Sequence, residues 1–80
     1  MYIKKWIKNE HGIMFRLNNK LVQTNFNDKS QIILYTQKDI LLFSSTHGKD
    51  KQIIDLNSTD LLKYPEINRR YLIYYLDFSM

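Results

Sequence analysis

The stretch Val22–Tyr35, VQTNFNDKSQIILY, decides the fold of this chain. Over residues 22–26, Val22, Thr24 and Phe26 alternate with the amides Gln23 and Asn25, which is the pattern of a strand with one buried face. Residues 27–29 predict a tight turn, because Asn and Asp side chains satisfy turn backbone groups and tolerate left-handed dihedrals. Apolar residues return at Ile32 and Leu34. β-branched and aromatic residues on both sides of a polar turn indicate a β-hairpin.

Further segments along the chain carry the same signals of strands separated by polar turns. Asn18–Lys20 is predicted as a hairpin turn, since Asn is the non-glycine residue that most readily adopts a positive φ. Residues 39–44 are apolar at successive positions, which indicates a central strand or one covered on both sides. The predicted strands span about residues 2–8, 12–17, 21–26, 30–35, 39–44 and 51–56.

The hydrophobic period changes after the last of these strands. Residues 57–60 offer capping groups for a short helical turn. Pro65 suits the first position of a helix and Glu66 suits the positive end of its dipole, so a helix is predicted over about residues 65–78. Its apolar residues surround most of the circumference and include Ile67, Tyr71, Tyr74 and Tyr75. We expect such a helix to be covered by its own sheet and by a second chain.

Together these elements predict an α+β fold, a six-stranded antiparallel sheet in meander order with one C-terminal helix packed on it, as a single domain over residues 1–80. Hairpin-length connections favour antiparallel neighbours, and no crossover helix is available for parallel pairing. The side that faces the helix is expected to carry Ile13, Phe15, Leu17, Val22, Phe26, Ile32 and Leu34. The open side is expected to carry Met14, Arg16, Gln23, Asn25, Ile33 and Tyr35.

The size and charge of the chain argue against several classes of protein. A chain of 80 residues buries only about 60% of the surface that its unfolded form exposes, so self-association would help its marginal core. The formal net charge of +4 is scattered, without the blocks of a nucleic-acid-binding arm. No apolar run approaches the ~20 residues that span a bilayer, and the start is too short and too charged for a signal peptide. The lack of cysteine fits an intracellular protein, and the abrupt ends suggest a fragment of a longer one.

The sequence shows no catalytic or cofactor-binding pattern. His11 and His47 fall in predicted turns without other ligands nearby, and a metal site needs three or four convergent ones. Gly12 and Gly48 are the only glycines, so no phosphate-cradling loop is available. We therefore predict no enzyme activity, metal or cofactor for this segment. A small basic nucleic-acid binder stays open as an alternative class, although the tyrosines have the spacing of a helical core.

The strand series with its terminal helix resembles a polo box, the non-catalytic module at the C-terminal end of polo-like kinases. The resemblance rests first on Val22–Ile32, with the pattern VQxxFNDxSQI. Lys5–Ile7 and Gly12–Leu17 are similar to the first two strands of the box. Pro65–Ile67 and Leu72–Leu76 are similar to its helix. The resemblance implies a protein-interaction domain whose parent protein is a serine/threonine kinase.

A tandem phosphopeptide-binding module is one function that this resemblance implies. In the mitotic polo-like kinases, two boxes form a cleft in which a tryptophan of the first box and a His/Lys pair of the second hold a phosphopeptide. Trp6 sits where the first-box tryptophan would be. Lys29 falls at the histidine position and Gln31 at the lysine position, so one charge of the pair is missing. We keep this function as the alternative.

The segments VQTNFNDKSQI and YPEI are more similar to the third polo box of the centriole-duplication polo-like kinase. That resemblance implies hydrophobic, phosphate-independent binding to a coiled-coil segment of a centriole scaffold protein, and self-association as a homodimer. It also implies a cytoplasmic protein at the centriole or centrosome that regulates the kinase in centriole duplication, with no nucleic acid or membrane as partner. The predicted partner-binding residues are Trp6, Met14, Arg16, Lys29, Ile33, Tyr35, Tyr71 and Tyr75, with Arg16 and Lys29 as rim charges.

Overall fold

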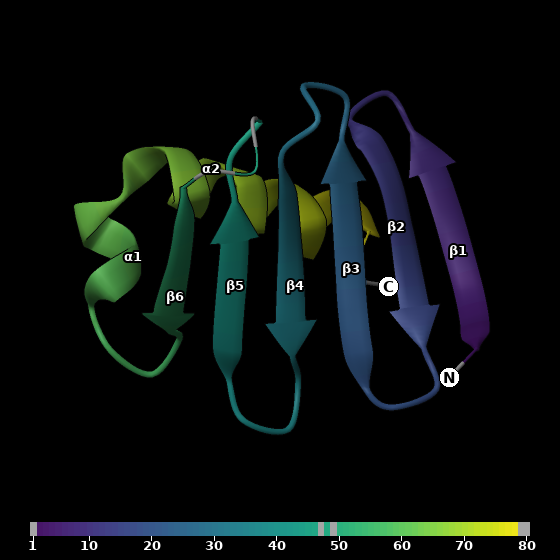
Figure 1. The fold of residues 1–80 in the computed structure, drawn as a ribbon, viewed down its shortest axis with the longest axis horizontal. Coiled ribbons are helices and arrows are strands. Elements are labelled where there is room, and N and C mark those ends of the chain that lie inside the picture. The colour runs from purple at the N-terminus through teal and green to yellow at the C-terminus, as the bar shows by residue number, and fades with distance from the viewer. Residues whose placement is uncertain (1, 47, 49, 79–80) are drawn as a thin grey trace.

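A computed structural model of the chain describes residues 2–46, 48 and 50–78. Residues 77 and 78 are described by their backbone alone. Six antiparallel strands lie in sequence order in one sheet, and the C-terminal helical segments cross one of its faces (Figure 1). The predicted fold is confirmed. The elements are β1 (Ile3–Asn9), β2 (Gly12–Leu17), β3 (Leu21–Phe26), β4 (Gln31–Tyr35), β5 (Ile40–Ser44), β6 (Lys51–Asp55), α1 (Asp60–Lys63), α2 (Pro65–Ile73) and the π-helical turn η1 (Tyr74–Phe78). His47, expected in a turn, lies outside the described residues.

Three of the turns between strands contain a non-glycine residue with positive φ. Lys20, Lys29 and Asp39 have φ values of 65°, 71° and 53°. A residue in this left-handed region is a common part of three-residue hairpin loops. The expectation that Asn would take this conformation in the β2–β3 turn is wrong, because Lys20 takes it. Asn19 Oδ1 instead accepts a hydrogen bond from the backbone N–H of Leu21 at 3.3 Å.

The side chains of β2 point in the opposite directions to those predicted. Met14 is 2% exposed and lies in the core on the helix side. Its partner in the register is Thr24, and directly paired residues share one face of a sheet. Ile13, Phe15 and Leu17 are therefore half-buried on the open face, whereas the sequence predicts Met14 and Arg16 there. The length of the β2–β3 turn explains the difference. Its three residues, 18–20, decide which residues of β2 and β3 pair, and paired residues share one face.

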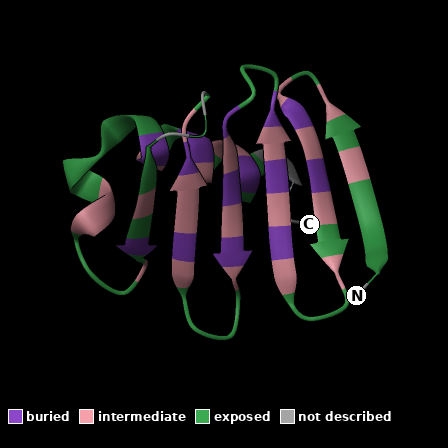
Figure 2. Ribbon diagram, viewed as in Figure 1, coloured by how far each residue is buried: buried purple, intermediate pink, exposed green. Residues whose placement is uncertain are grey.

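The core fills the space between the sheet and the helical segment. Its apolar residues are all at most 8% exposed, and they are Met14, Val22, Phe26, Ile32, Leu34, Leu41, Ile54, Ile67 and Tyr74. Figure 2 shows the buried positions alternating along the central strands. β5 lies between β4 and β6, as its apolar run predicted. β1 forms one edge of the sheet and is mostly exposed, whereas α1 lies beside β6 at the other edge (Figure 1).

Arg70 connects α2 to the turn between β3 and β4. The residue is 8% exposed, and its Nη2 donates a hydrogen bond to Asp28 Oδ2 at 2.7 Å. Its Nε donates to the hydroxyl of Ser30 at 2.9 Å, and its Nη1 donates to the carbonyl of Glu66 at 3.0 Å. The guanidinium carbon also lies 5.4 Å from the centroid of the Phe43 ring. The buried charge is thus paired and hydrogen-bonded, which a charge in a protein interior requires.

The carboxylate of Asp28 completes this network. Its Oδ1 accepts hydrogen bonds from the backbone N–H of Ser30 at 2.9 Å and from the Ser30 hydroxyl at 2.5 Å. Burial raises the pKa of Asp28, but the bonds from Ser30 and the neighbouring Arg70 outweigh it and lower the pKa from 3.8 to about 2. The stabilising contribution of the carboxylate is therefore present above about pH 4 and is lost as the pH falls toward about 2.

Replacing Arg70 should weaken the attachment of α2 to the sheet. We expect Arg70→Met to lower the free energy of unfolding by about 2–4 kcal/mol, because it removes charge-assisted hydrogen bonds and leaves Ser30 without its donor. Urea denaturation followed by circular dichroism measures this loss. The matched control is Arg69→Met, which changes an exposed neighbour and should cost no more than about 0.5 kcal/mol. Equal losses in the two variants would contradict the role of Arg70.

Candidate protein-binding surface

The face of the sheet opposite the helix carries a row of side chains that crosses all six strands. Each member pairs directly with the next across the strand register, so all lie on one face. We call this set the central row: Trp6, Phe15, Gln23, Ile33, Leu42 and Ile53. All but Gln23 are apolar, so the open face has an apolar band from one edge strand to the other.

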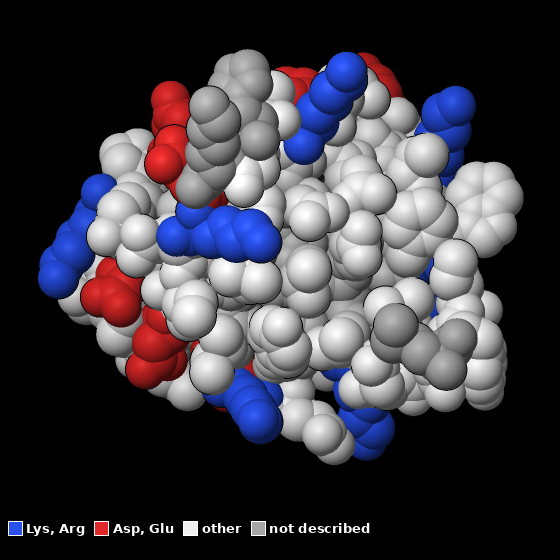
Figure 3. Space-filling model, in the orientation of Figure 1, with Lys and Arg blue, Asp and Glu red and all other residues white. Residues whose placement is uncertain are grey.

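No element in the described part of the chain covers the central row (Figure 2). Its two ends are the most exposed, with Trp6 at 62% and Ile53 at 67%, and the members between them are half-buried by their neighbours. Figure 3 views this face and shows few charged atoms at its middle, with most of the charged side chains toward the margin. An apolar centre with a polar rim is the usual anatomy of a protein interface.

The apolar area extends beside the central row toward the β4–β5 turn. Leu21 pairs with Tyr35, which pairs with Ile40 in β5, so the three form a second short row on the same face. Tyr35 and Ile40, together with Leu42 and Ile53 of the central row, line a shallow cavity of about 240 Å³. The open face therefore offers a depression for an apolar side chain of a partner.

Two hydrogen bonds join polar side chains inside this face. Gln23 Nε2 donates hydrogen bonds to Asn25 Oδ1 at 3.1 Å and to Gln31 Oε1 at 3.2 Å. A polar group that already has an internal partner costs less to cover than one that depends on water. A protein can thus lie over Gln23 without breaking these two hydrogen bonds.

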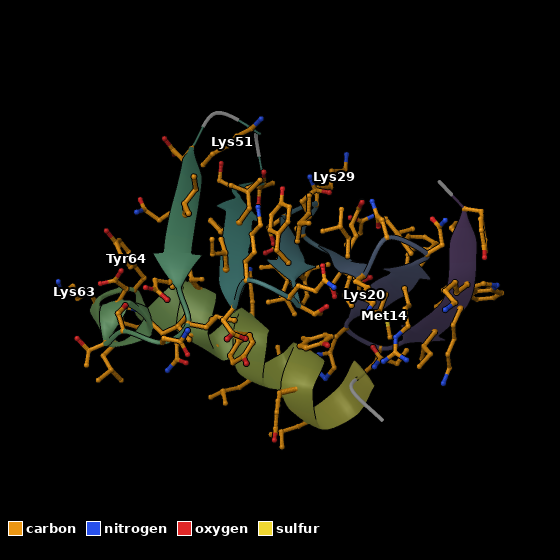
Figure 4. All side chains as sticks on the ribbon, turned by 90° about the horizontal axis from the view of Figure 1, so that it is seen from below. Met14, Lys20, Lys29, Lys51, Lys63 and Tyr64 are labelled. Atoms are coloured by element: carbon orange, nitrogen blue, oxygen red, sulfur yellow. The ribbon has the colours of Figure 1, made fainter. Side chains whose placement is uncertain are left out.

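The eight predicted partner-binding residues do not form one site. Trp6 and Ile33 share the central row, and Tyr35 lies beside it, as expected for the open side. Lys29 is exposed in the turn between β3 and β4 (Figure 4). The expected position of Met14 on the open side is wrong, because Met14 is in the core.

The remaining three predicted residues lie on the helix side of the sheet or on the helix itself. Arg16 pairs with the core residue Val22, so its expected position on the open side is also wrong. The ring of Tyr71 lies 6.2 Å from that of Tyr74 and 6.4 Å from that of Tyr75, between centroids. Burial, followed by its tyrosine neighbours, raises the pKa of Tyr71. Tyr75 is 58% exposed.

A second apolar surface lies on the outer side of the helical segment. Leu72, Tyr75 and Leu76 are 47%, 58% and 71% exposed, and we call them the helix patch. The helix is thus apolar beyond the side that packs on the sheet, as its sequence predicted. The helix patch and the central row lie on opposite sides of the molecule, because the sheet and core separate them.

The sequence interpretation missed three members of the central row. Phe15 was assigned to the wrong face, although counting the three residues of the β2–β3 turn would have corrected it. Leu42 and Ile53 were placed on strands but not on the surface, because their faces depend on the register of two further hairpins.

The described residues contain no group of three His, Cys, Asp or Glu side chains that could hold a metal ion. No helix in the same part of the chain is long and apolar enough to cross a membrane. The chemistry that the open face offers is apolar contact and hydrogen bonding.

Comparison with known families gives a match over most of the chain. The family model described as the POLO box duplicated region matches residues 9–71. A probable serine/threonine-protein kinase PLK from Dictyostelium discoideum is 47% identical over 49 residues, which are 61% of this chain and 5% of that protein. A probable serine/threonine-protein kinase CCRP1 from Zea mays is 46% identical over 37 residues, 46% of this chain and 6% of that protein. The chain therefore spans only about one twentieth of the curated relatives that it matches.

Comparison with solved structures gives a similar fold. The crystal structure of the budding yeast Cdc5 polo-box domain in complex with an Spc72 phosphopeptide matches with a TM-score of 0.69 and 20% sequence identity. The match covers 92% of this chain and 31% of that chain. At this identity the likeness shows a shared fold.

The fluorescence of Trp6 should report whether the open face is covered. Trp6 is the one tryptophan of the chain and is 62% exposed, so in the dilute protein we expect emission close to that of free tryptophan and full quenching by acrylamide. Covering of the central row should shift the emission to shorter wavelength and reduce the quenching. A short-wavelength emission that dilution does not change would contradict the exposed position.

Proposed function

Because this chain belongs to the polo-box family, we propose that it is a non-catalytic protein-interaction domain that binds its partner with the open face of its sheet. The curated relatives are probable serine/threonine kinases. On this proposal the parent protein is such a kinase, and the chain serves to target and regulate it.

The uncovered central row is the observation that carries this proposal. It joins side chains of all six strands on the side that the helix leaves open, all of them apolar except Gln23, with Trp6 at one end and Ile53 at the other. Burying apolar surface of this kind contributes about 25 cal/mol per Å² before the costs of association are subtracted. Trp is also the residue type most enriched among those that dominate binding energy at interfaces.

For the occupant, we propose a coiled-coil segment of a centriole scaffold protein, and in its absence a second copy of this chain. Val22–Ile32 and the helix start at Pro65 resemble the third polo box of the centriole-duplication kinase, which supports this choice. The apolar character of the face supports it too, since binding there would not need a phosphate. The proposed place of action is the centriole or centrosome, in the cytoplasm, during centriole duplication.

Light scattering across a concentration series tests the self-association. We expect the mass to rise from monomer to dimer, and Ile33→Asp combined with Tyr35→Asp to keep the chain monomeric, because two carboxylates would be buried in the interface. The control is Leu72→Asp, which places a carboxylate on the exposed helix patch. It should leave the dimer intact.

Two results would count against this proposal. A wild-type chain that stays monomeric up to about 1 mM, where the association free energy would be weaker than about 4 kcal/mol, would contradict self-association. Loss of the dimer in Leu72→Asp but not in the double variant would move the interface to the helix patch. Circular dichroism of each variant checks that the fold is retained.

A phosphopeptide-binding role, with this chain as one half of a tandem module, is the second candidate. Two observations favour it: Trp6 is exposed on the open face, and Lys29 is exposed in the β3–β4 turn. The uncharged Gln31 weighs against it, because a phosphate would lack one of the two cations expected from the resemblance.

Binding of a degenerate phosphothreonine peptide library, compared with the same library without phosphate, separates the two candidates. If the centriole-type function holds, we expect no preference for the phosphorylated library. A preference for the phosphorylated library would favour the tandem module if Lys29→Gln lowers it by about tenfold and if it decreases as the salt concentration rises. Lys51→Gln is the matched control, because it removes an exposed lysine from β6, away from the β3–β4 turn.

A further inference from the structure

A basic pocket lies on the helix side of the sheet, away from the central row. Lys4, Arg16 and Lys20 line it, with Thr36 and Tyr74, around a cavity of about 330 Å³. Lys20 and the helical segment that bounds the pocket can be followed in Figure 4. The pocket is therefore a different surface from the one that carries the proposed function.

The three cations come from separate segments that meet at this place. Arg16 is in β2, and Lys20 is in the β2–β3 turn with a φ of 65°. Lys4 sits at the register shift between Ile3 and Lys5, where β1 is out of step with β2. A bulge of this kind redirects a side chain from the regular alternation of a strand. The pocket thus gathers charges from β1, β2 and the β2–β3 turn.

Hydrogen bonds hold the backbone of these segments in place. The backbone N–H of Tyr2 donates to Asn18 Oδ1 at 2.9 Å, and the N–H of Asn18 donates to the carbonyl of Tyr2 at 3.0 Å. The carbonyl of Lys20 accepts from the hydroxyl of Thr36 at 2.7 Å and from its N–H at 3.4 Å. Little ordering of the backbone would therefore be needed when a ligand binds.

No carboxylate among the described residues compensates these cations. The ion pairs of the described part of the chain involve Arg70, Lys63 and His11, and none includes a cation of the pocket. The charges are also unevenly distributed along the sequence. Residues 1–26 contain five Lys or Arg and one Glu, whereas residues 27–80 contain seven basic and seven acidic residues. The whole net charge of +4 therefore belongs to β1–β3 and their turns.

We propose that the basic pocket binds a phosphate group. A phosphorylated side chain carries about −1.5 to −2 charges and three strong acceptor oxygens at pH 7, which matches three basic residues around one pocket better than a single carboxylate would. The guanidinium of Arg16 offers a planar pair of donors, and the ammonium groups of Lys4 and Lys20 act as point charges around it. The phosphate can come from a phosphorylated side chain of a protein or from free inorganic phosphate.

Nuclear magnetic resonance titration of the chain with two probes tests this proposal. The probes are inorganic phosphate and N-acetyl-phosphoserine N-methylamide, with the unphosphorylated amide as a blank. We expect saturable shifts at Lys4, Arg16 and Lys20 with a phosphate probe and none with the blank. Tighter binding of the phosphoserine amide would identify a protein side chain as the source, and equal or tighter binding of inorganic phosphate would identify the free ion.

Arg16→Gln should lower the affinity for the phosphate probe by about tenfold or more, since it removes a charge-assisted pair of hydrogen bonds. Lys51→Gln removes the same charge from β6 and should leave the affinity unchanged. No saturable shift, or equal losses in both variants, would overturn the proposal. Shifts confined to Lys29 and its turn would also overturn it, and they would point to the tandem module instead. Failure here leaves the role of the open face untouched.

Discussion

The buried guanidinium of Arg70 is the interaction on which the rest of the structure depends. It joins α2 to the one turn that closes the central hairpin, through Asp28 and Ser30. Apolar contact is non-directional, so by itself it would hold the helix on the sheet without fixing the angle or the position of the helix relative to the strands. The directional hydrogen bonds of Arg70 fix both, and the core residues around Ile67 then pack in a single arrangement.

Fixing the helix on one face of the sheet leaves the other face open. A sheet of six strands with one short helical segment has more apolar surface than that segment can cover. The central row is the surface that remains, and its one polar member, Gln23, already donates hydrogen bonds to Asn25 and Gln31 beside it. The basic pocket lies on the opposite side, so the two surfaces can be occupied at the same time.

Much of this fold could be predicted from the sequence, because alternation and turn residues are local properties. The hairpin of residues 22–35 and the helix start at Pro65 are of this kind. The face of β2 was predicted wrongly, because it depends on how many residues the turn contributes and not on which side chains of β2 are apolar. The partnership of Arg70 with Asp28 could not be predicted, since the two residues are 42 positions apart and meet only when the helix docks. The candidate surface shares that difficulty, because Ile53 joins Trp6 only through the register of five strand pairs.

The edges of the sheet have a consequence for the form that any assembly of this protein can take. β1 is an unprotected outer strand, and an open edge of that length invites strand-by-strand growth into fibrils. Three lysines and an irregular register make β1 a poor template, and α1 stands beside the other edge. Copies that meet face to face instead bury the same surface on both partners and form a closed pair. If copies of this chain associate through the open face as proposed, accumulation at a high local concentration would end in discrete complexes and not in polymers.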